Sequence, residues 1–234
     1  NNRFVILNRL DVHSQGQATF NNPVVIDADP GVMQIIIEQP SNNQNAINID
    51  GNISNNEYTD YIAIKNFEIV SGDVGIHVAK GNNIWLHNNR IHGADSNGIR
   101  VNDPVNYDSI WITSNEIYDI NSNQQPPDVG SGIYLGVENG AFRVAHANIL
   151  FNKIHDVLTY GIQLKTNSFN NVIAYNDITR SGWPGIIVYG NGGSCQQNIV
   201  DSNLLYNVGT RNENGIQAQG GAIIANNVII KSGY

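Results

Sequence analysis

The sequence predicts an all-β solenoid, in which short coils stack along one axis and each coil adds one strand to each of three parallel sheets. Three observations support this prediction. Apolar and polar residues alternate at the two-residue period of a β-strand, and no segment of the 234 residues shows the period of a helix. A Gly-Ile-x-Val/Leu signature recurs along the chain. An Asn-x-Ile/Leu/Val signature recurs with it at intervals of 24 to 37 residues, as expected for one single domain over residues 1–234.

The first sixty residues have the least regular pattern. Apolar runs occur at 4–7, 24–26, 35–37 and 46–49, separated by Asn, Pro, Gly and Asp, which favour turns. We interpret residues 1–60 as irregular N-terminal coils that precede the regular repeat.

From residue 61 to residue 234 each predicted coil contains three strands in a fixed order. The Gly-Ile-x-Val/Leu stretches form the first strands, at 75–78, 98–101, 132–135, 161–164, 185–188 and 215–218. Second strands follow at apolar-x-apolar stretches such as 84–86, 110–112 and 147–149. The third strands start at the repeated asparagine, at 89–91, 115–117, 152–154, 176–178, 203–205 and 227–229.

The repeated asparagine is expected to lie in an inward bend between the second and third strands. Its positions are Asn89, Asn115, Asn152, Asn176, Asn203 and Asn227, and Phe67 takes this place in the first regular coil. Stacked coils bring successive amides to about 4.8 Å from each other along the axis. Because a buried amide without partners costs about 1–3 kcal/mol, the column stabilises the fold only when it is continuous. We predict an internal Asn ladder with a structural role.

Composition narrows the possible partners of the chain. Only 14% of the residues are charged, the net charge is -8 and the pI is about 5.0, which argues against nucleic acid and against an anionic membrane surface. No apolar run is long enough for a membrane-spanning helix, so no membrane insertion is expected. Cys195 is the only cysteine, which excludes an intrachain disulfide and leaves the redox compartment open. The oligomeric state is not predicted.

The repeats resemble a known family. The Gly-Ile-x-Val/Leu strands and the Asn column, over about residues 61–234, look like the right-handed parallel β-helix of the pectate-lyase-like superfamily and are nearest in pattern to its polysaccharide lyase branches. That superfamily also includes hydrolases, epimerases, phage tailspikes and adhesins, so the fold alone does not select a function. The Gly-His-Gly segment of polygalacturonases and the Asp-Pro-His motif of alginate epimerases are absent, which disfavours both activities.

In this resemblance a groove lies over the first strands and is walled by the neighbouring loops. Alternation predicts two outward columns there, the first being His77, Arg100, Tyr134, Gln163, Ile187 and Gln217, and the second Ala79, Asn102, Gly136, Lys165, Tyr189 and Gln219. Long loops at 119–131, 137–146, 190–197 and 207–214 predict a cleft over Tyr134, Lys165 and Tyr189. Aromatic rings stack on sugars, and amides or guanidinium groups bond their hydroxyls and carboxylates. The predicted substrate-binding residues are His77, Arg100, Asn102, Gln163, Gln217 and Gln219, and the alternative is a solvated sheet face.

Lyase chemistry on a uronic acid needs a cation at the carboxylate, a base for the C5 proton and an acid at the leaving oxygen. Lys165, within Gly-Ile-Gln-Leu-Lys-Thr, matches the lysine of the alginate-lyase and chondroitinase-like branch, where it is catalytic. A lysine base must lose its proton, which requires neighbouring cations or desolvation. That branch places an arginine on the next coil, where this chain has Tyr189. Tyr189 or Tyr134 is the predicted proton donor, and Arg100 is two coils from Lys165.

A calcium site is the other expectation taken from the resemblance. The aspartate cluster of calcium-dependent pectate lyases is missing from the first strands, but four carboxylates lie in or beside the flanking loops and offer hard oxygen ligands: Asp119, Asp128, Glu138 and Asp156. Surface charge is the alternative for each. His92, Tyr118, His155, Thr179 and Tyr206 form a further column past the third strands, which is either a structural ladder or a metal site.

These observations favour a secreted or cell-surface carbohydrate-active protein, and among such proteins a polysaccharide lyase that cleaves an acidic glycan by β-elimination. The chain does not start with a signal peptide, so we expect that a leader is absent or has been removed. The alternatives are that the protein is intracellular or that the sequence is a fragment. The main functional alternative is a non-catalytic glycan-binding, adhesive or tailspike-like β-helix. The missing arginine and aspartate cluster favour that alternative, whereas Lys165 and Tyr189 between long loops favour the enzyme. A net charge of -8 disfavours an anionic substrate unless Ca2+ intervenes.

Overall fold

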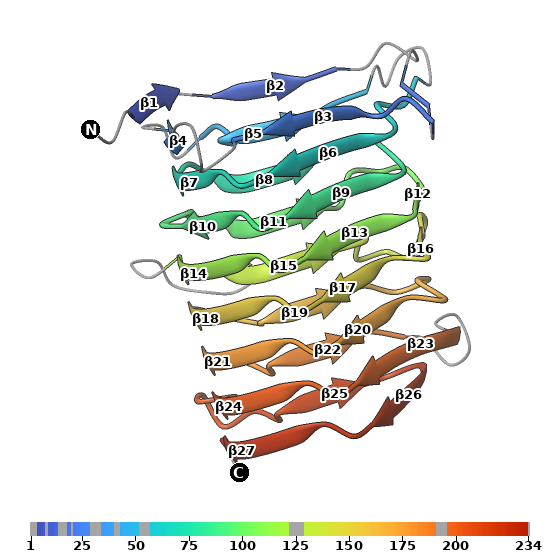
Figure 1. Ribbon diagram of the computed structural model, residues 1–234. Coiled ribbons are helices and arrows are strands. Elements are labelled where there is room, and N and C mark those ends of the chain that lie inside the picture. Colours follow the sequence, from blue (N-terminus) through green and yellow to red (C-terminus); the bar gives the residue numbers. More distant parts are fainter. Residues whose placement is uncertain are drawn as a thin grey trace.

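The chain forms a solenoid of parallel β coils (Figure 1). The computed structural model describes residues 4–7, 9–13, 18–19, 21–28, 34–39, 43–51, 57–121, 129–190 and 196–233. Its strands run in three parallel sheets around one hydrophobic core, and consecutive strands of a coil belong to different sheets. We name them sheets 1, 2 and 3, after the first, second and third strands of the predicted coil.

Each sheet collects one strand from every coil. Sheet 1 comprises β2 (Leu10–Val12), β5 (Ile47–Ile49), β8 (Val74–Val78), β11 (Asn97–Val101), β15 (Ser131–Leu135), β19 (Ile162–Leu164), β22 (Ile186–Val188) and β25 (Ile216–Ala218). Sheet 2 comprises β3 (Val24–Asp27), β6 (Ile62–Lys65), β9 (Ile84–His87), β13 (Ile110–Thr113), β17 (Asn148–Leu150), β20 (Val172–Ala174), β23 (Gln196–Asp201) and β26 (Gly221–Ala225). Sheet 3 comprises β1 (Phe4–Leu7), β4 (Gln34–Gln39), β7 (Glu68–Ser71), β10 (Arg90–His92), β14 (Glu116–Ile120), β18 (Lys153–Val157), β21 (Asp177–Ser181), β24 (Leu204–Val208) and β27 (Val228–Ser232). A short pair, β12 (Tyr107–Asp108) and β16 (Val144–Ala145), lies outside the three sheets.

The three-sheet architecture confirms the predicted all-β solenoid, and the predicted strands of the regular coils lie in the expected sheets. The N-terminal residues contribute strands to the same sheets, since β3, β4 and β5 pair in parallel with β6, β7 and β8. β2 falls outside the apolar runs that the sequence shows. Among the described residues, no helix has the length and apolar character that crossing a membrane requires.

The core consists of aligned aliphatic stacks, which follow from the two-residue alternation of the strands. On sheet 1 the register pairs Ile76 with Ile99, Ile99 with Ile133, Ile133 with Ile162 and Ile162 with Ile186. All five side chains are fully buried. Burying an isoleucine side chain stabilises the fold by about 1.5–3 kcal/mol, so this stack fixes the register of every coil it joins.

Glycine precedes the buried isoleucine in the first strands of the regular coils because the neighbouring coil leaves no room for a side chain. A Cβ placed on Gly98 would lie 2.7 Å from the carbonyl oxygen of Gly132 and 2.4 Å from Cγ2 of Ile117. On Gly132 it would lie 2.7 Å from the oxygen of Gly161 and 2.6 Å from Cγ2 of Ile154. Any larger residue would push consecutive coils apart beneath the outward face of sheet 1.

The predicted Asn ladder is present between sheets 2 and 3. Each side-chain amide donates to Oδ1 of the asparagine in the next coil, at 2.9 to 3.0 Å, through the series Asn89, Asn115, Asn152, Asn176, Asn203 and Asn227. The backbone N–H of Phe67 donates to Oδ1 of Asn89, which ties the first regular coil to the ladder. The residues before these asparagines have positive φ, including Phe151 and Tyr175, and this conformation makes the bend.

A second amide pair, absent from the sequence prediction, links the last coils on the side between sheets 1 and 2. The Nδ2 atom of Asn171 donates to Oδ1 of Asn198 at 2.9 Å and to the carbonyl oxygen of Val144 at 3.0 Å. Both asparagines are buried. Only two coils carry asparagine here, so no long repeat marks the position in the sequence.

The outward column of sheet 3 forms an aromatic stack. The rings of His92 and Tyr118 lie 4.8 Å apart at 11°, and those of Tyr118 and His155 lie 5.0 Å apart at 9°. His92 pairs with Glu68, and His155 with Asp156. The geometry is that of the structural ladder, one of the two alternatives that the sequence left open.

Candidate functional site

The outward face of sheet 1 carries the candidate groove. The strand register places His77 beside Arg100, Arg100 beside Tyr134, Tyr134 beside Gln163, and Ile187 beside Gln217. The predicted first column is therefore present. The second column continues past the strand ends, because the backbone N–H groups of Lys165, Tyr189 and Gln219 donate to carbonyl oxygens of the preceding coil, each at 2.8 Å.

Lys165 lies at the centre of this face, enclosed by aromatic rings. Its Nζ atom is 4.3 Å from the ring centroid of Tyr189 and 5.1 Å from that of Tyr134. Nζ also pairs with Oε1 of Glu138 at 3.2 Å. Lys165 is only 7% exposed, and Glu138 is exposed. The three residues of the predicted cleft thus meet around one ammonium group, which ring faces and a carboxylate both attract.

A pair of tyrosine hydroxyls borders the lysine. The hydroxyl oxygens of Tyr160 and Tyr189 are 2.7 Å apart, so one phenol donates to the other. The ring of Tyr160 also contacts Trp183 edge to face, at 5.0 Å between centroids. Sequence reasoning missed Tyr160 and Trp183 because it followed only the strand residues. The available signal was an aromatic residue just ahead of two successive first strands.

The buried amide of Gln163 faces a hydroxyl pair. Its Nε2 atom donates to Oγ of Ser131 at 2.6 Å, and that oxygen lies 3.1 Å from Oγ1 of Thr159. Gln163 is 2% exposed. Gln163 is therefore buried beside Tyr134 on the neighbouring strand, with its amide already bonded to Ser131.

Two other predicted binding residues are held in polar contacts at the N-terminal end of the face. His77 is 6% exposed, with Nε2 3.0 Å from Asp103 and Nδ1 3.1 Å from the side-chain oxygen of Asn48. Arg100 pairs with Asp73 at 3.5 Å, and burial raises the pKa of that carboxyl. One strand, β15, lies between β11 and β19, so Arg100 is two coil spacings, about 10 Å, from the coil of Lys165.

The remaining amides of the prediction lie on either side of Lys165 along the axis. Asn102 is half-buried and follows β11, whereas Gln217 is half-buried and Gln219 is exposed on the coil after Tyr189. They extend the polar surface along the axis, away from Lys165.

Of the carboxylates predicted to hold calcium, two lie side by side on sheet 3 and a third lies beside sheet 1. Asp119 and Asp156 belong to strands β14 and β18 of sheet 3, and Asp156 binds Arg180 and His155. Arg180 lowers the pKa of Asp156 to about 2. Glu138 instead contacts Lys165 beside sheet 1, and Asp128 lies outside the described residues. The described ranges contain no cluster of three or more His, Cys, Asp or Glu residues suited to a metal ion.

Residues 64–230, more than half of the chain, match the family model described as a right handed beta helix region. The chain belongs to this family. Among solved structures, the alginate lyase from Paenibacillus sp. str. FPU-7 is similar with a TM-score of 0.58 and 12% identity, over 98% of this chain and 90% of that one. At this identity the likeness shows the fold alone. A comparison with curated proteins gave no match.

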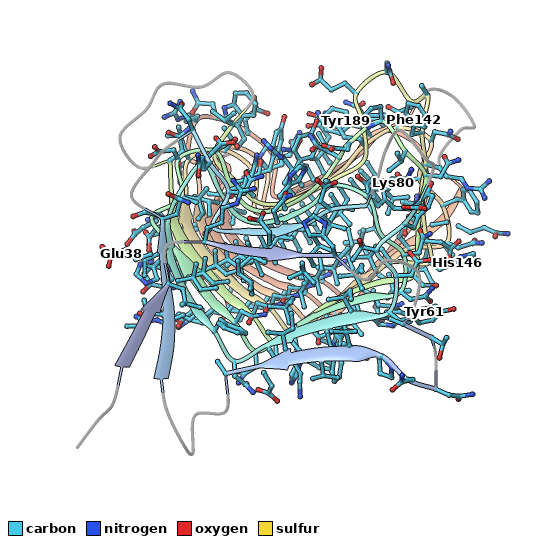
Figure 2. The ribbon with its side chains drawn as sticks, turned by 90° about the horizontal axis from the view of Figure 1, so that it is seen from above. Glu38, Tyr61, Lys80, Phe142, His146 and Tyr189 are labelled. Atoms are coloured by element: carbon cyan, nitrogen blue, oxygen red, sulfur yellow. The ribbon has the colours of Figure 1, made fainter. Side chains whose placement is uncertain are left out.

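Three sides of this β-helix differ in what they present. Viewed along the axis, Tyr189, Tyr61 and Glu38 mark separate sides of the coil (Figure 2). Tyr189 follows β22 of sheet 1, Tyr61 precedes β6 of sheet 2, and Glu38 lies in β4 of sheet 3. The candidate site around Lys165 therefore lies on the side of sheet 1.

Proposed function

We propose that the protein is a carbohydrate-active β-helix protein, and specifically a polysaccharide lyase that cleaves a uronic-acid-containing glycan by β-elimination in the groove over sheet 1. The observation that carries the proposal is the position of Lys165, a nearly buried cation between Tyr134 and Tyr189. The similar alginate lyase fold supports it. Action on an external polysaccharide fits a secreted or cell-surface protein.

The proposed chemistry follows from charge. The ammonium of Lys165 exchanges its contact with Glu138 for the carboxylate of the sugar and stabilises the charge that develops there when the C5 proton leaves. Tyr189 accepts that proton in its phenolate form, with the ammonium of Lys165 beside its ring and the hydroxyl of Tyr160 within hydrogen-bond distance of its oxygen. The bond between C4 and its glycosidic oxygen breaks, a C4–C5 double bond forms, and Tyr189 or Tyr134 protonates the leaving oxygen. No oxidant or water is consumed.

The direct test is product formation. The protein is incubated with alginate, pectate and glycosaminoglycans, each with added Ca2+ and with a chelator, while far-UV absorbance reports the unsaturated uronate. We expect absorbance to rise with one of these polymers, and the two arms decide whether Ca2+ takes part. Lys165→Ala should abolish the signal, whereas Lys153→Ala, on exposed sheet 3, should retain it. A flat trace with every polymer excludes the lyase.

The second candidate is glycan binding without cleavage. Two observations favour it: Lys165 already has a carboxylate partner, and Tyr189 stands where the lyase branch has arginine. Retention on a polyuronate matrix that depends on Lys165, together with no unsaturated product, would select this function.

A further inference from the structure

An aromatic surface lies on sheet 2, away from the groove. Trp85 in β9 and Trp111 in β13 are register partners on adjacent strands. They are 40% and 36% exposed. We call these two residues the Trp platform. Large aromatic side chains normally contribute their area to a core, so two adjacent exposed indoles mark a contact surface.

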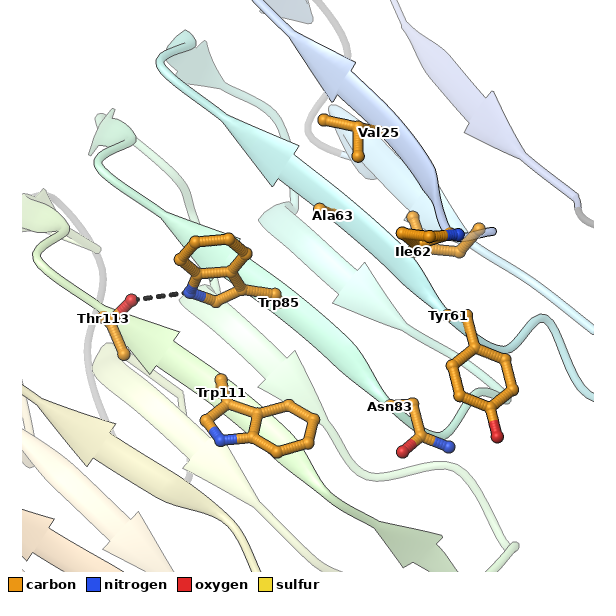
Figure 3. A pocket seen from close by; sticks show the side chains of 9 residues that line it. Val25, Tyr61, Ile62, Ala63, Asn83, Trp85, Trp111 and Thr113 are labelled. Atoms are coloured by element: carbon orange, nitrogen blue, oxygen red, sulfur yellow. Dashed lines mark hydrogen bonds between the residues drawn. The ribbon is translucent and has the colours of Figure 1, made fainter. Parts of the chain in front are cut away.

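A cavity of about 510 Å3 opens beside the Trp platform (Figure 3). The indoles line it together with Val25, Tyr61, Asn83 and Thr113. Its volume lies within the roughly 300–1,000 Å3 typical of small-ligand sites. The cavity exists because Ala63 takes the register position next to Trp85, where a larger side chain would fill the space.

The platform is held in place by polar contacts at its edge. Nε1 of Trp85 donates to Oγ1 of Thr113 at 2.8 Å (Figure 3). Nδ1 of His87 lies 2.9 Å from the same oxygen. Lys65 places its ammonium 5.9 Å from the Trp85 ring centroid while pairing with Asp27 at 2.8 Å. The Trp85 side chain therefore loses little conformational entropy when a ligand binds to its ring.

We propose that the Trp platform and its cavity form a second, non-catalytic glycan site, which binds the apolar faces of consecutive pyranose rings in an unbranched chain. Adjacent parallel strands lie about 4.8 Å apart, a spacing comparable with one sugar ring, so a chain parallel to the axis presents successive rings to successive indoles. Asn83 and the hydroxyl of Tyr61 border the cavity and offer partners for sugar hydroxyls.

The size of the apolar surface argues for a sugar chain against a protein partner. A stable protein interface buries about 800 Å2 on each side. Here the apolar column ends at Asn148, the register partner of Trp111, and the Lys65–Asp27 ion pair bounds the edge of the platform. The surface of two indoles between these polar borders has the size of a few sugar rings. The proposal does not rest on the lyase activity of sheet 1.

Native gels that contain dissolved sodium alginate, hydroxyethyl cellulose or no polymer test the platform. We expect at least one polymer to retard the wild-type protein, and Trp111→Ala and Trp85→Ala to weaken that binding at least about ten-fold. Tyr175→Ala, which removes an exposed aromatic from the bend after β20, should migrate as wild type. Trp111→Tyr keeps a flat ring and should restore most of the retardation, which separates stacking from misfolding.

The groove is tested separately in the same gels. Lys165→Ala should remain retarded, because the platform is intact, even if lyase activity is absent from every variant. Retardation that survives the double Trp85→Ala, Trp111→Ala replacement in a Lys165→Ala background overturns the proposal. So does an unretarded wild type, or self-association in sedimentation velocity that depends on Trp111.

Tryptophan fluorescence locates the bound sugar, because the chain has three tryptophans. Trp183→Phe leaves only the platform indoles, and its emission should change on titration with oligosaccharides of the retarding polymer. The Trp85→Phe, Trp111→Phe variant leaves Trp183 beside Tyr160. A response confined to this second variant places the sugar in the groove and contradicts the proposal.

Discussion

The side-chain amide of Asn115 donates to Oδ1 of Asn152 at 3.0 Å, although 37 residues separate the two asparagines. Coils that close in 24 residues make the same bond at the same distance, as Asn152 does with Asn176. The longer coil therefore places its additional residues outside the ladder. The spacing of the outward columns is set by the ladder and the core, while the loops are free to vary in length.

Replacing Asn115 by Ala should be among the most damaging single changes in the ladder. Its Oδ1 accepts from both amide groups of Asn89, and its Nδ2 donates to Leu86 and Asn152. Each buried partner left unsatisfied costs about 1–3 kcal/mol. Urea denaturation should show a loss of more than about 2 kcal/mol in the free energy of unfolding. Asn227→Ala, at the half-buried end, serves as the matched control and should cost less, so equal losses would contradict the ladder as a continuous network.

The Tyr189→Phe variant tests the role of the Tyr189 hydroxyl independently of its ring. The variant keeps the ring next to Lys165 but cannot carry a proton, so kcat on the active polyuronate should fall by about 10²- to 10⁴-fold. KM and the melting temperature should change little. A matched Tyr175→Phe change on the exposed corner should leave kcat intact. Unchanged kcat in Tyr189→Phe would remove this tyrosine from the proposed chemistry.

Glu138→Gln should improve substrate binding. The carboxylate of Glu138 competes with the sugar carboxylate for Lys165, so its neutralisation should lower KM for a polyuronate. Because Glu138 is exposed, the free energy of unfolding should shift by less than about 1 kcal/mol. Steady-state kinetics and thermal unfolding of the same preparation measure both. A higher KM would show that Glu138 contacts the substrate directly.

The ion pair of Asp156 and Arg180 on sheet 3 should make the free energy of unfolding depend on pH. Arg180 lowers its pKa from 3.8 to about 2 in the folded protein, so the pair stabilises the fold above pH 4 and is lost as the pH falls toward 2. Asp156→Asn should therefore be less stable than wild type at pH 6, and the difference should disappear toward pH 2. Urea unfolding across this range gives the two curves. Parallel curves would show that the ion pair contributes nothing to stability.

The fold was readable from the sequence because its determinants repeat. Ile133 and Ile162 recur at one strand position, Asn115 and Asn152 at one bend, and their spacing alone predicts the register. The contacts of Lys165 were less accessible. Alternation predicts that Lys165 points outward, but the salt bridge with Glu138 and the hydroxyl pair of Tyr160 and Tyr189 depend on loops that carry no repeat.

The same limit explains what happened to His77 and Gln163. Both were expected to face a bound sugar because they alternate with buried residues. In the structure His77 contacts Asp103, from the segment after β11, and Gln163 contacts Ser131, from the preceding coil. An outward direction is a property of one strand, whereas accessibility depends on neighbouring polar groups that the strand pattern does not encode. The Trp platform was not predicted, because it becomes visible only when the second strands of two consecutive coils are compared with each other.

The glycine series at the start of sheet 1 has a consequence for how such a protein can change. A Cβ on Gly98 or Gly132 would meet the carbonyl oxygen of the following glycine, so consecutive coils approach each other equally closely at this position whatever the length of their loops. The outward face of sheet 1 can therefore change in whole units: duplicating or removing one coil would lengthen or shorten it by one strand spacing of about 4.8 Å, and the same close approach would form at the new junction.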